Sequence, residues 1–218
     1  MMSNAAAQRF NMVESQVRAN DVTDVRVQEA LREVPRERFV PAAKRAVAYA
    51  DGPLELVPGR FLLEPRVYAK LLQLAEIQPG DTVLDVGCAT GYSTAVLARL
   101  AAKVIGLEED ADLVRVATDM APAVGAGNIL IVQGALAGGY KGAAPYDVIF
   151  INGAVEAAPT ALLGQLAEGG RLVTVLREGT QGQAVLYRKE DGQIGHWAGF
   201  DAAAQVLAGF RQHAGFVF

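Results

Sequence analysis

The sequence has very little cysteine, histidine or tryptophan: one, two and one residue among 218. The single cysteine, Cys88, excludes an intrachain disulfide and a cysteine-rich metal site. His196 and His213 have no metal-ligand partners near them in the sequence, so we expect both to be structural or solvated and expect no metal. The net charge is −4 and there is no basic tract, so we expect no nucleic-acid partner.

Two further absences bear on location. No apolar run reaches the roughly 18 residues that a transmembrane helix requires. The first residues lack the apolar core of a secretory signal. We therefore expect a cytoplasmic protein without a membrane partner. Nothing in the sequence indicates the oligomeric state.

What the sequence does have is apolar residues, at 51% of the total, with 20% charged. This composition supports a buried core and argues against disorder. The length fits one domain over residues 1–218. We expect a helical cap with a substrate loop over residues 1–78, because its pattern is too loose for a separate core, and an α/β core over residues 79–218.

The strongest local pattern lies at residues 79–100. A Pro-Gly turn signal precedes a short apolar run, Thr82 to Val86, and the last eight residues have the composition of a helix. Gly87 and Gly91 lie between this strand and this helix. Glycine lets a ligand approach the backbone closely, and a helix start presents N–H groups. The pattern predicts a strand, a glycine turn and a helix.

An acidic residue follows about 20 positions later. Residues 103–107 predict the next strand, which ends at Glu108, a place from which a carboxylate can accept hydrogen bonds from both ribose hydroxyls of a nucleoside. Asp85 and Ala89 depart from the dinucleotide pattern Gly-x-Gly-x-x-Gly. The motif instead resembles the S-adenosylmethionine (SAM) site of class I methyltransferases, where the first acid faces the methionine part. A tight turn that merely packs a helix on a sheet is the alternative.

The rest of the chain alternates predicted strands with helices. This alternation predicts an α/β fold with a mostly parallel, doubly wound sheet, whose ligands bind at the carboxyl ends of the strands. Helices are predicted within residues 8–34, with a break at Asp21 or Thr23, and at 65–75, 110–124 and 159–166, where Gly169-Gly170 stops the last one. An extended arm is predicted at 54–63, and strands at 128–132, 146–151 and 171–176. A C-terminal antiparallel hairpin is predicted at 183–200, with its turn at Asp191-Gly192.

Segments along nearly the whole chain resemble the protein-L-isoaspartate O-methyltransferase family. The sequence Val34-Pro-Arg-Glu-Arg-Phe-Val-Pro41 looks like part of that family's opening, and Val83–Tyr92 matches its SAM motif. Residues 159–173 match a later block. The resemblance implies a class I SAM-methyltransferase (Rossmann-like) fold, SAM as cofactor, and methylation of the free α-carboxyl of isoaspartyl residues in damaged proteins or peptides.

The substrate loop departs from that family's pattern Gly-Gln-Thr-Ile-Ser-Gln-Pro. Over residues 59–65 this chain has Gly-Arg-Phe-Leu-Leu-Glu-Pro, with Leu63 at the serine position. A serine hydroxyl donates or accepts a hydrogen bond beside a carboxylate, and leucine does neither. Glu64 would repel an anionic carboxylate if it faced the pocket, whereas Arg60 can attract one.

Two departures concern the cofactor site. Where the family has an acid that contacts adenine, this chain has Ala135. The small-residue stretch after the fourth strand is preceded here by Asn152, which can bond substrate or cofactor. Cys88 is expected to line the turn as a small residue rather than to act as a nucleophile, because no histidine is near it in the sequence. Tyr92 is expected to pack under the turn.

Methyl transfer from SAM asks little of protein side chains, because the cofactor carries the reactive group. The protein aligns the acceptor with the methyl carbon and excludes water, and a carboxylate acceptor is already ionised at pH 7. The sequence therefore assigns no catalytic residue, and the candidates for contact with the acceptor are Arg60, Leu63 and Glu64 of the substrate loop. The predicted cofactor contacts are Asp85, Gly87, Cys88, Ala89, Gly91, Glu108, Ala135 and Asn152.

Three functions stay open at this point. The first is a SAM-dependent O-methyltransferase acting on isoaspartyl residues or on another, small carboxylate. The second is a SAM-binding protein with a different acceptor or without transferase activity, which the changes at Leu63 and Ala135 motivate. The third is an NAD-dependent oxidoreductase, which would use the same strand-turn-helix unit.

Overall fold

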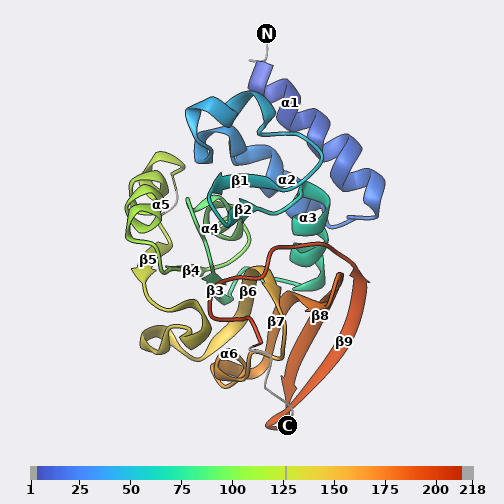
Figure 1. The fold of residues 1–218 in the computed structure, drawn as a ribbon, viewed down its shortest axis with the longest axis vertical. Helices are drawn as coiled ribbons and strands as arrows, with labels where there is room; N and C mark the ends of the chain where they lie inside the picture. Colours follow the sequence, from blue (N-terminus) through green and yellow to red (C-terminus); the bar gives the residue numbers. More distant parts are fainter. Residues whose placement is uncertain (1–3, 126, 213–218) are drawn as a thin grey trace.

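The computed structural model describes residues 4–125 and 127–212 (Figure 1). Within them, seven strands form one sheet in the order β5-β4-β3-β6-β7-β8-β9. His213 lies outside the described residues, as do Phe216 and Phe218, for which the aromatic C-terminal end of the sequence predicts packing in the core or at an interface. The strands are β3 (Thr82–Val86), β4 (Lys103–Glu108), β5 (Ile129–Gln133), β6 (Tyr146–Val155), β7 (Leu166–Glu178), β8 (Gln181–Glu190) and β9 (Gln193–Asp201).

The sheet is parallel from β5 to β7 and antiparallel from β7 to β9. This confirms the expected doubly wound sheet with a C-terminal hairpin. Asp191 and Gly192 both have positive φ, 51° and 73°, as a two-residue hairpin turn of the primed type requires. β3 and β4 lie inside the sheet, and their apolar side chains are buried, which explains their continuous apolar sequences.

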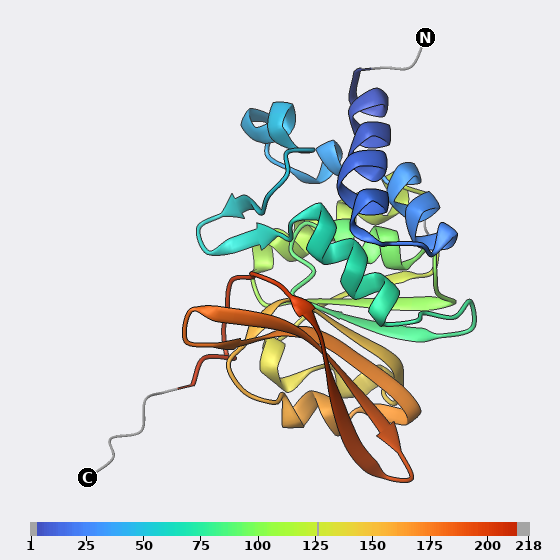
Figure 2. The same cartoon turned by 90° about the vertical axis from the view of Figure 1, so that its right-hand side faces the viewer.

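Helices cover both faces of this sheet. Figure 2 shows α3 (Pro65–Leu74) and the N-terminal helices on one side and α6 (Thr160–Leu163) on the other. α4 (Tyr92–Leu97) follows the glycine turn directly. α5 (Ala111–Ala123) begins as predicted, because the Asp110 side chain accepts hydrogen bonds from the first-turn N–H groups, and Pro122 lies at its end.

The N-terminal helices are α1 (Asn4–Met12) and α2 (Val25–Glu33). α1 continues through a π-helical turn, Val13–Val17, and a 3₁₀ turn that ends at Asn20. Asp21 then adopts a left-handed conformation with φ 65°, so the break falls at one of the two predicted positions. The cap of α2 is Asp24, whose side chain accepts from the Arg26 N–H, and the sequence analysis did not identify it.

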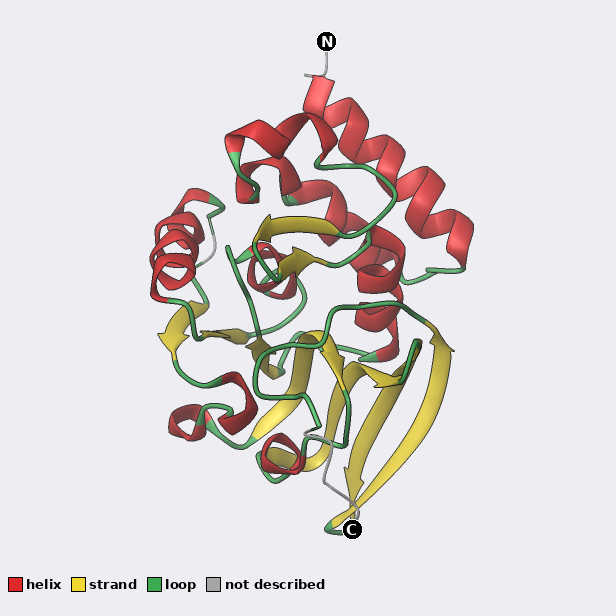
Figure 3. Ribbon diagram, in the orientation of Figure 1, coloured by secondary structure: helices red, strands yellow, loops and turns green. Residues whose placement is uncertain are grey.

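The predicted extended arm is a two-stranded antiparallel hairpin, formed by β1 (Leu54–Val57) and β2 (Arg60–Leu62). Gly59 has φ 78° in its turn. In Figure 3 these two short yellow strands lie among the red helices, apart from the main sheet. Two 3₁₀ segments, Arg36–Phe39 and Ala42–Val47, precede the hairpin.

The predicted helix stop at Gly169 and Gly170 is wrong. α6 ends at Leu163, and Leu166 already pairs with Tyr146 as part of β7. The register then shifts, and a Cβ at Gly170 would meet the carbonyl oxygens of Ala167 and Tyr146 at 2.8 and 2.9 Å. These glycines therefore form a bulge between parallel strands: Gly169 has φ 76°, and a side chain at Gly170 has no room. β6 also runs beyond its predicted end and includes Asn152.

The chain after β9 returns across the sheet. Ala154 donates its N–H to the Gln205 carbonyl at 2.8 Å, and its carbonyl accepts from the Leu207 N–H at 3.0 Å. Residues 202–210, called the C-terminal segment below, thereby pair with the end of β6 (Figure 1). Phe210, for which the aromatic end of the sequence predicts packing in the core or at an interface, is buried. Among the described helices, none is long and apolar enough to cross a membrane.

Candidate functional site

The glycine turn is held against the end of the neighbouring strand β4. The N–H groups of Gly87 and Cys88 both donate to the Leu107 carbonyl, at 2.9 and 3.2 Å. Gly87, Ala89 and Gly91 have positive φ of 76°, 50° and 90°. The turn therefore needs glycine at two of its positions for conformational reasons.

The N–H groups of the turn do not all face a ligand, contrary to the expectation for a helix start. Besides the two that bond Leu107, the Ala89 N–H donates to Glu108 at 2.8 Å and the Gly91 N–H to the Cys88 carbonyl at 2.8 Å. These four donors are satisfied within the protein. A ligand at this turn would therefore be bound mainly by the side chains around the turn, which are described next.

Asp85 is fully buried near the end of β3. Its Oδ2 accepts hydrogen bonds from the hydroxyls of Ser93 and Thr94, at 2.7 and 2.6 Å, and its Oδ1 accepts one from the side-chain amide of Asn152. Burial raises the pKa of Asp85 to about 6, although these three hydrogen bonds oppose the shift; the negative charge of Glu108 adds to it. The sequence analysis missed Ser93 and Thr94 as partners.

Glu108 is the last residue of β4 and is also fully buried. Its Oε1 accepts from the N–H groups of Glu109 and Asp110, at 2.9 and 3.2 Å. Its Oε2 accepts from the Ala89 N–H and from the guanidinium of Arg60, with which it forms an ion pair. The strand end, the glycine turn and the β1–β2 hairpin thus meet at one carboxylate.

The loop residues Leu63 and Glu64 lie in different surroundings. The Leu63 side chain is buried, next to a small cavity of about 10 Å³ that Tyr92 and Asn152 also line, enough for about one water molecule. Glu64 forms an ion pair with Arg66 at 2.8 Å and is not among the residues that line this cavity. Its charge is therefore compensated outside the site.

Arg36 is a residue that the sequence analysis did not single out as functional. It is 1% exposed, and its guanidinium donates to the carbonyls of Ala48 and Leu63, at 2.8 and 3.0 Å. The same group lies 5.0 Å from the ring centre of Tyr92, a cation–π contact that confirms the packed position of Tyr92 under the turn. Its immediate neighbours are Pro35 and the charged Glu37, so no local signal in the sequence marks it for burial.

Cys88 and Ala135 complete the predicted set. Cys88 is buried in the turn, and burial raises the pKa of its thiol well above the usual value, so it has no thiolate character near pH 7. Ala135 is exposed at the start of a 3₁₀ turn, Leu136–Gly138. The buried neighbour at that position is Leu136, so this part of the chain offers an apolar contact in place of a carboxylate.

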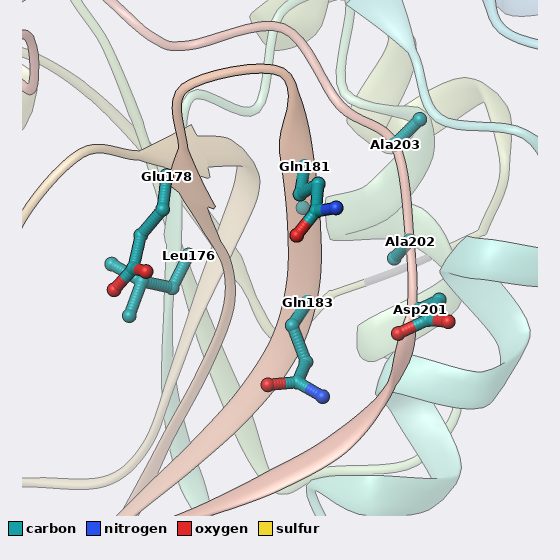
Figure 4. Close-up of a pocket in the computed structure, with 8 residues that line it drawn as sticks. Leu176, Glu178, Gln181, Gln183, Asp201, Ala202 and Ala203 are labelled. Carbon is teal, nitrogen blue, oxygen red and sulfur yellow. The ribbon is translucent and has the colours of Figure 1, made fainter.

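A larger hollow lies elsewhere in the molecule. It has a volume of about 550 Å³, and no predicted site residue lines it. Figure 4 shows side chains from β7, β8 and the end of β9 around it. Its lining is Leu176, Glu178, Gln181, Gly182, Gln183, Asp201, Ala202 and Ala203.

These residues fit SAM in their chemistry. A buried carboxylate at the end of β4 supplies acceptors of the kind that ribose hydroxyls need, and a glycine turn separates it from the carboxylate of Asp85. A Cβ added at Gly87 would lie 2.9 Å from Leu207 Cδ1, so glycine lets the C-terminal segment pack directly on the turn. Fold and site together define a class I methyltransferase-type α/β domain.

Comparisons with known proteins are specific. The model of the protein-L-isoaspartate(D-aspartate) O-methyltransferase family matches residues 7–198. A protein-L-isoaspartate O-methyltransferase of Koribacter versatilis is 37% identical over 193 residues, covering 88% of this chain and 87% of that protein. One of Methylorubrum populi is 40% identical over 172 residues, covering 79% and 80%. The chain belongs to the protein-L-isoaspartate O-methyltransferase family.

Solved structures agree on the fold. A protein-L-isoaspartate O-methyltransferase matches with a TM-score of 0.80 at 24% identity, over 94% of this chain and 66% of that one. A Plasmodium falciparum structure, described as a protein-L-isoaspartate O-methyltransferase in complex with S-adenosyl-L-homocysteine, matches with a TM-score of 0.79 at 23% identity, over 91% and 97%.

Proposed function

We infer that this chain is a SAM-dependent O-methyltransferase that methylates the α-carboxylate of isoaspartyl residues in proteins or peptides. The observation that carries the proposal is the pair of buried carboxylates, Asp85 and Glu108, on neighbouring strands β3 and β4 on either side of a glycine turn, in a chain of this family. When bound, SAM supplies the methyl group as an electrophile attached to a positively charged sulfur.

The roles of the site residues follow from their positions. Glu108 holds the ribose through its carboxylate, and Gly87 and Gly91 shape the turn beside it through their positive φ. Asp85 supplies negative charge to the methionine part, and Asn152 orients it by donating to Oδ1. Cys88 and Ala89 line the turn, and Ala135 with its buried neighbour Leu136 bounds the base by apolar contact.

The acceptor side depends on orientation rather than on acid–base catalysis. An isoaspartyl carboxylate is ionised at neutral pH, so the protein needs no base to activate it. Arg36 fixes the backbone of the substrate loop by bonding the Leu63 carbonyl, and this loop closes over the turn and excludes water. Arg60 and Glu64 belong to the same loop, and Leu63 gives it an apolar wall. A small free carboxylate is the rival acceptor.

The wider setting is part of the proposal. We propose that residues 1–78 act as a cap with the substrate loop on the core of residues 79–218. We also propose a cytoplasmic protein whose partners are its damaged protein or peptide substrates and which binds neither nucleic acid nor membrane.

The test is transfer of label from methyl-labelled SAM to a peptide that contains isoaspartate, with the same peptide containing ordinary aspartate as the negative control. We expect label on the isoaspartyl peptide alone, and at least tenfold less in Glu108→Gln, which loses one carboxylate acceptor. Glu109→Gln is the matched control, because Glu109 is the next acid in the sequence and its side chain is exposed, whereas that of Glu108 is buried. Absence of label from every acceptor, with intact folding, would contradict the proposal.

A second function has one observation in its favour, the burial of Leu63 where a serine would serve the acceptor. It is a SAM-binding protein that acts on another acceptor or on none. Calorimetric binding of S-adenosyl-L-homocysteine together with no label on isoaspartyl peptide would support this second function. If the protein binds neither SAM nor S-adenosyl-L-homocysteine at millimolar concentration, both proposed functions are excluded.

A further inference from the structure

The side chain of Arg60 reaches from the β1–β2 hairpin to the carboxylate of Glu108, 48 positions away in the sequence. The contact joins a side chain that is 11% exposed with one that is 0% exposed, so it is an ion pair largely withdrawn from water. Glu108 is the residue to which the proposed function assigns the ribose. Arg60 therefore lies at the position where the cofactor is expected to bind.

The hydrogen bonds of Glu108 account for all its acceptor capacity. An ionised carboxylate has about four lone-pair positions. Two are taken at Oε1 by the N–H groups of Glu109 and Asp110, and two at Oε2 by the Ala89 N–H and Arg60. Three of these donors are backbone groups of the site itself. Arg60 is the one side-chain donor, and it is the one that can leave without refolding the turn.

The position of Arg60 is costly for its own guanidinium. Its Nη1 atom is buried and, within the described residues, has no hydrogen-bond partner. A buried donor without an acceptor costs free energy, and a charged one costs more. If Arg60 leaves Glu108, its guanidinium regains water, which offsets part of the lost ion pair. Exchange of Arg60 for two ribose hydroxyls is therefore chemically reasonable.

A second side chain covers the same surface. The place where a Cβ of Gly87 would lie is 3.4 Å from Arg60 Nη2 and 2.9 Å from Leu207 Cδ1. The hairpin and the C-terminal segment thus both contact the glycine turn. Leu207 is apolar and has no side-chain donor, so of these two side chains only Arg60 can compete with a ligand for the carboxylate of Glu108.

We propose that Arg60 is an internal competitor of the cofactor: it occupies the ribose-binding carboxylate, and SAM or its product must displace it to bind. The inference rests on the proposed function for the identity of the displacing ligand. Because β2 carries both Arg60 and the start of the substrate loop, cofactor binding and the position of that loop are coupled. Arg60 acts on affinity in this way and is not a catalytic residue.

The main experiment measures S-adenosyl-L-homocysteine binding by titration calorimetry on the full chain. Arg60→Gln removes the charge and the ion pair, and its amide nitrogen lies two bonds closer to the backbone than the guanidinium Nη2 that bonds Glu108. We expect it to bind the ligand about tenfold to a hundredfold more tightly than the wild type, the range that loss of a competing hydrogen bond to a charged group implies. The control is Arg66→Gln, which breaks the 2.8 Å ion pair with Glu64 in the same loop, and should stay within about threefold.

Hydrogen exchange gives a second, ligand-free readout. If Arg60 holds the hairpin against Glu108, the amides of residues 54–62 exchange faster in Arg60→Gln than in the wild type, and those of the control do not. A structural residue without a competing role would raise exchange but would not tighten binding.

The outcomes separate the two proposals. If the wild type binds S-adenosyl-L-homocysteine and Arg60→Gln binds it equally well or more weakly, the proposed competition is wrong, but the proposed function still stands. Binding by the variant but not by the wild type supports both. No binding by either protein at millimolar ligand overturns both, and unchanged hairpin exchange in the variant overturns the coupling.

Discussion

The side-chain amide of Asn152 donates a hydrogen bond to the carboxylate of Asp85, and so joins β6 to β3 at the carboxyl ends of two adjacent parallel strands. Within residues 4–125 and 127–212, the side-chain hydrogen-bond partners of Asp85 are two hydroxyls and an amide, and none of them is basic. The carboxylate is therefore buried with its charge only partly compensated, which explains a pKa of about 6.

This shift predicts how stability depends on pH. Asp85 binds its proton more tightly in the folded than in the unfolded state, so its contribution favours folding at low pH and is lost as pH rises from about 4 to about 6. Asp85→Asn removes this titration. We expect the unfolding free energy of the wild type, relative to the variant, to fall by about 3 kcal/mol between pH 4 and pH 7. Urea titrations at several pH values measure it, and a difference that does not vary with pH would contradict it.

Leu63→Ser places a hydroxyl beside the proposed acceptor position. We expect kcat/KM for an isoaspartyl peptide to rise about tenfold, because the hydroxyl can bond the acceptor carboxylate. The variant should also lose about 2–4 kcal/mol of stability, since the side chain removed is buried. Leu63→Ala separates added space from the hydroxyl; an equal gain in both variants would show that the hydroxyl is not the cause.

Arg36→Ala tests the anchor of the substrate loop. It removes the donors of two buried carbonyls, those of Ala48 and Leu63, and we expect a loss of about 3 kcal/mol or more in unfolding free energy. Arg38→Ala is the matched control, because Arg38 is exposed and should change stability by less than about 0.5 kcal/mol. A wild-type-like urea midpoint for Arg36→Ala would refute an anchoring role.

Gly153→Ala tests the packing of the C-terminal segment on β6. A Cβ at Gly153 would lie 2.6 Å from Leu207 Cγ and 2.9 Å from the Gln205 carbonyl oxygen. We expect a cost of about 1–3 kcal/mol and faster amide exchange in residues 202–210. Gly138→Ala, which would place its Cβ in open space, is the control. Equal exchange in the two variants would show that the segment does not depend on this contact.

Much of the fold follows from local sequence. The apolar run of β3 between Gly80 and Gly87, the Asp110 cap and the Asp191-Gly192 turn each combine signals that lie within a few residues of one another. Such signals act before any tertiary contact forms. They placed Asp85 and Glu108 correctly near the ends of neighbouring strands.

Where tertiary pairing competes with a local signal, the sequence analysis fails. Gly169 and Gly170 look like a helix stop, but pairing of Leu166 with Tyr146 draws this stretch into β7. The arm at residues 54–63 is extended as predicted, but the pairing of its two halves across Gly59 was not predicted. At Gly169 and Gly170, hydrogen bonds between β6 and β7 outweigh the local preference for a helix end.

The sequence by itself determined the class of fold, the glycine turn and the two acids beside it, because strand, turn and cap signals are local and the family's blocks span most of the chain. Tertiary structure alone decided what these acids contact. Asn152 meets Asp85 from 67 positions away, and Arg60 meets Glu108 from 48. Ion pairs and hydrogen bonds of this kind depend on burial and on which segments the sheet brings together, and no local pattern encodes either.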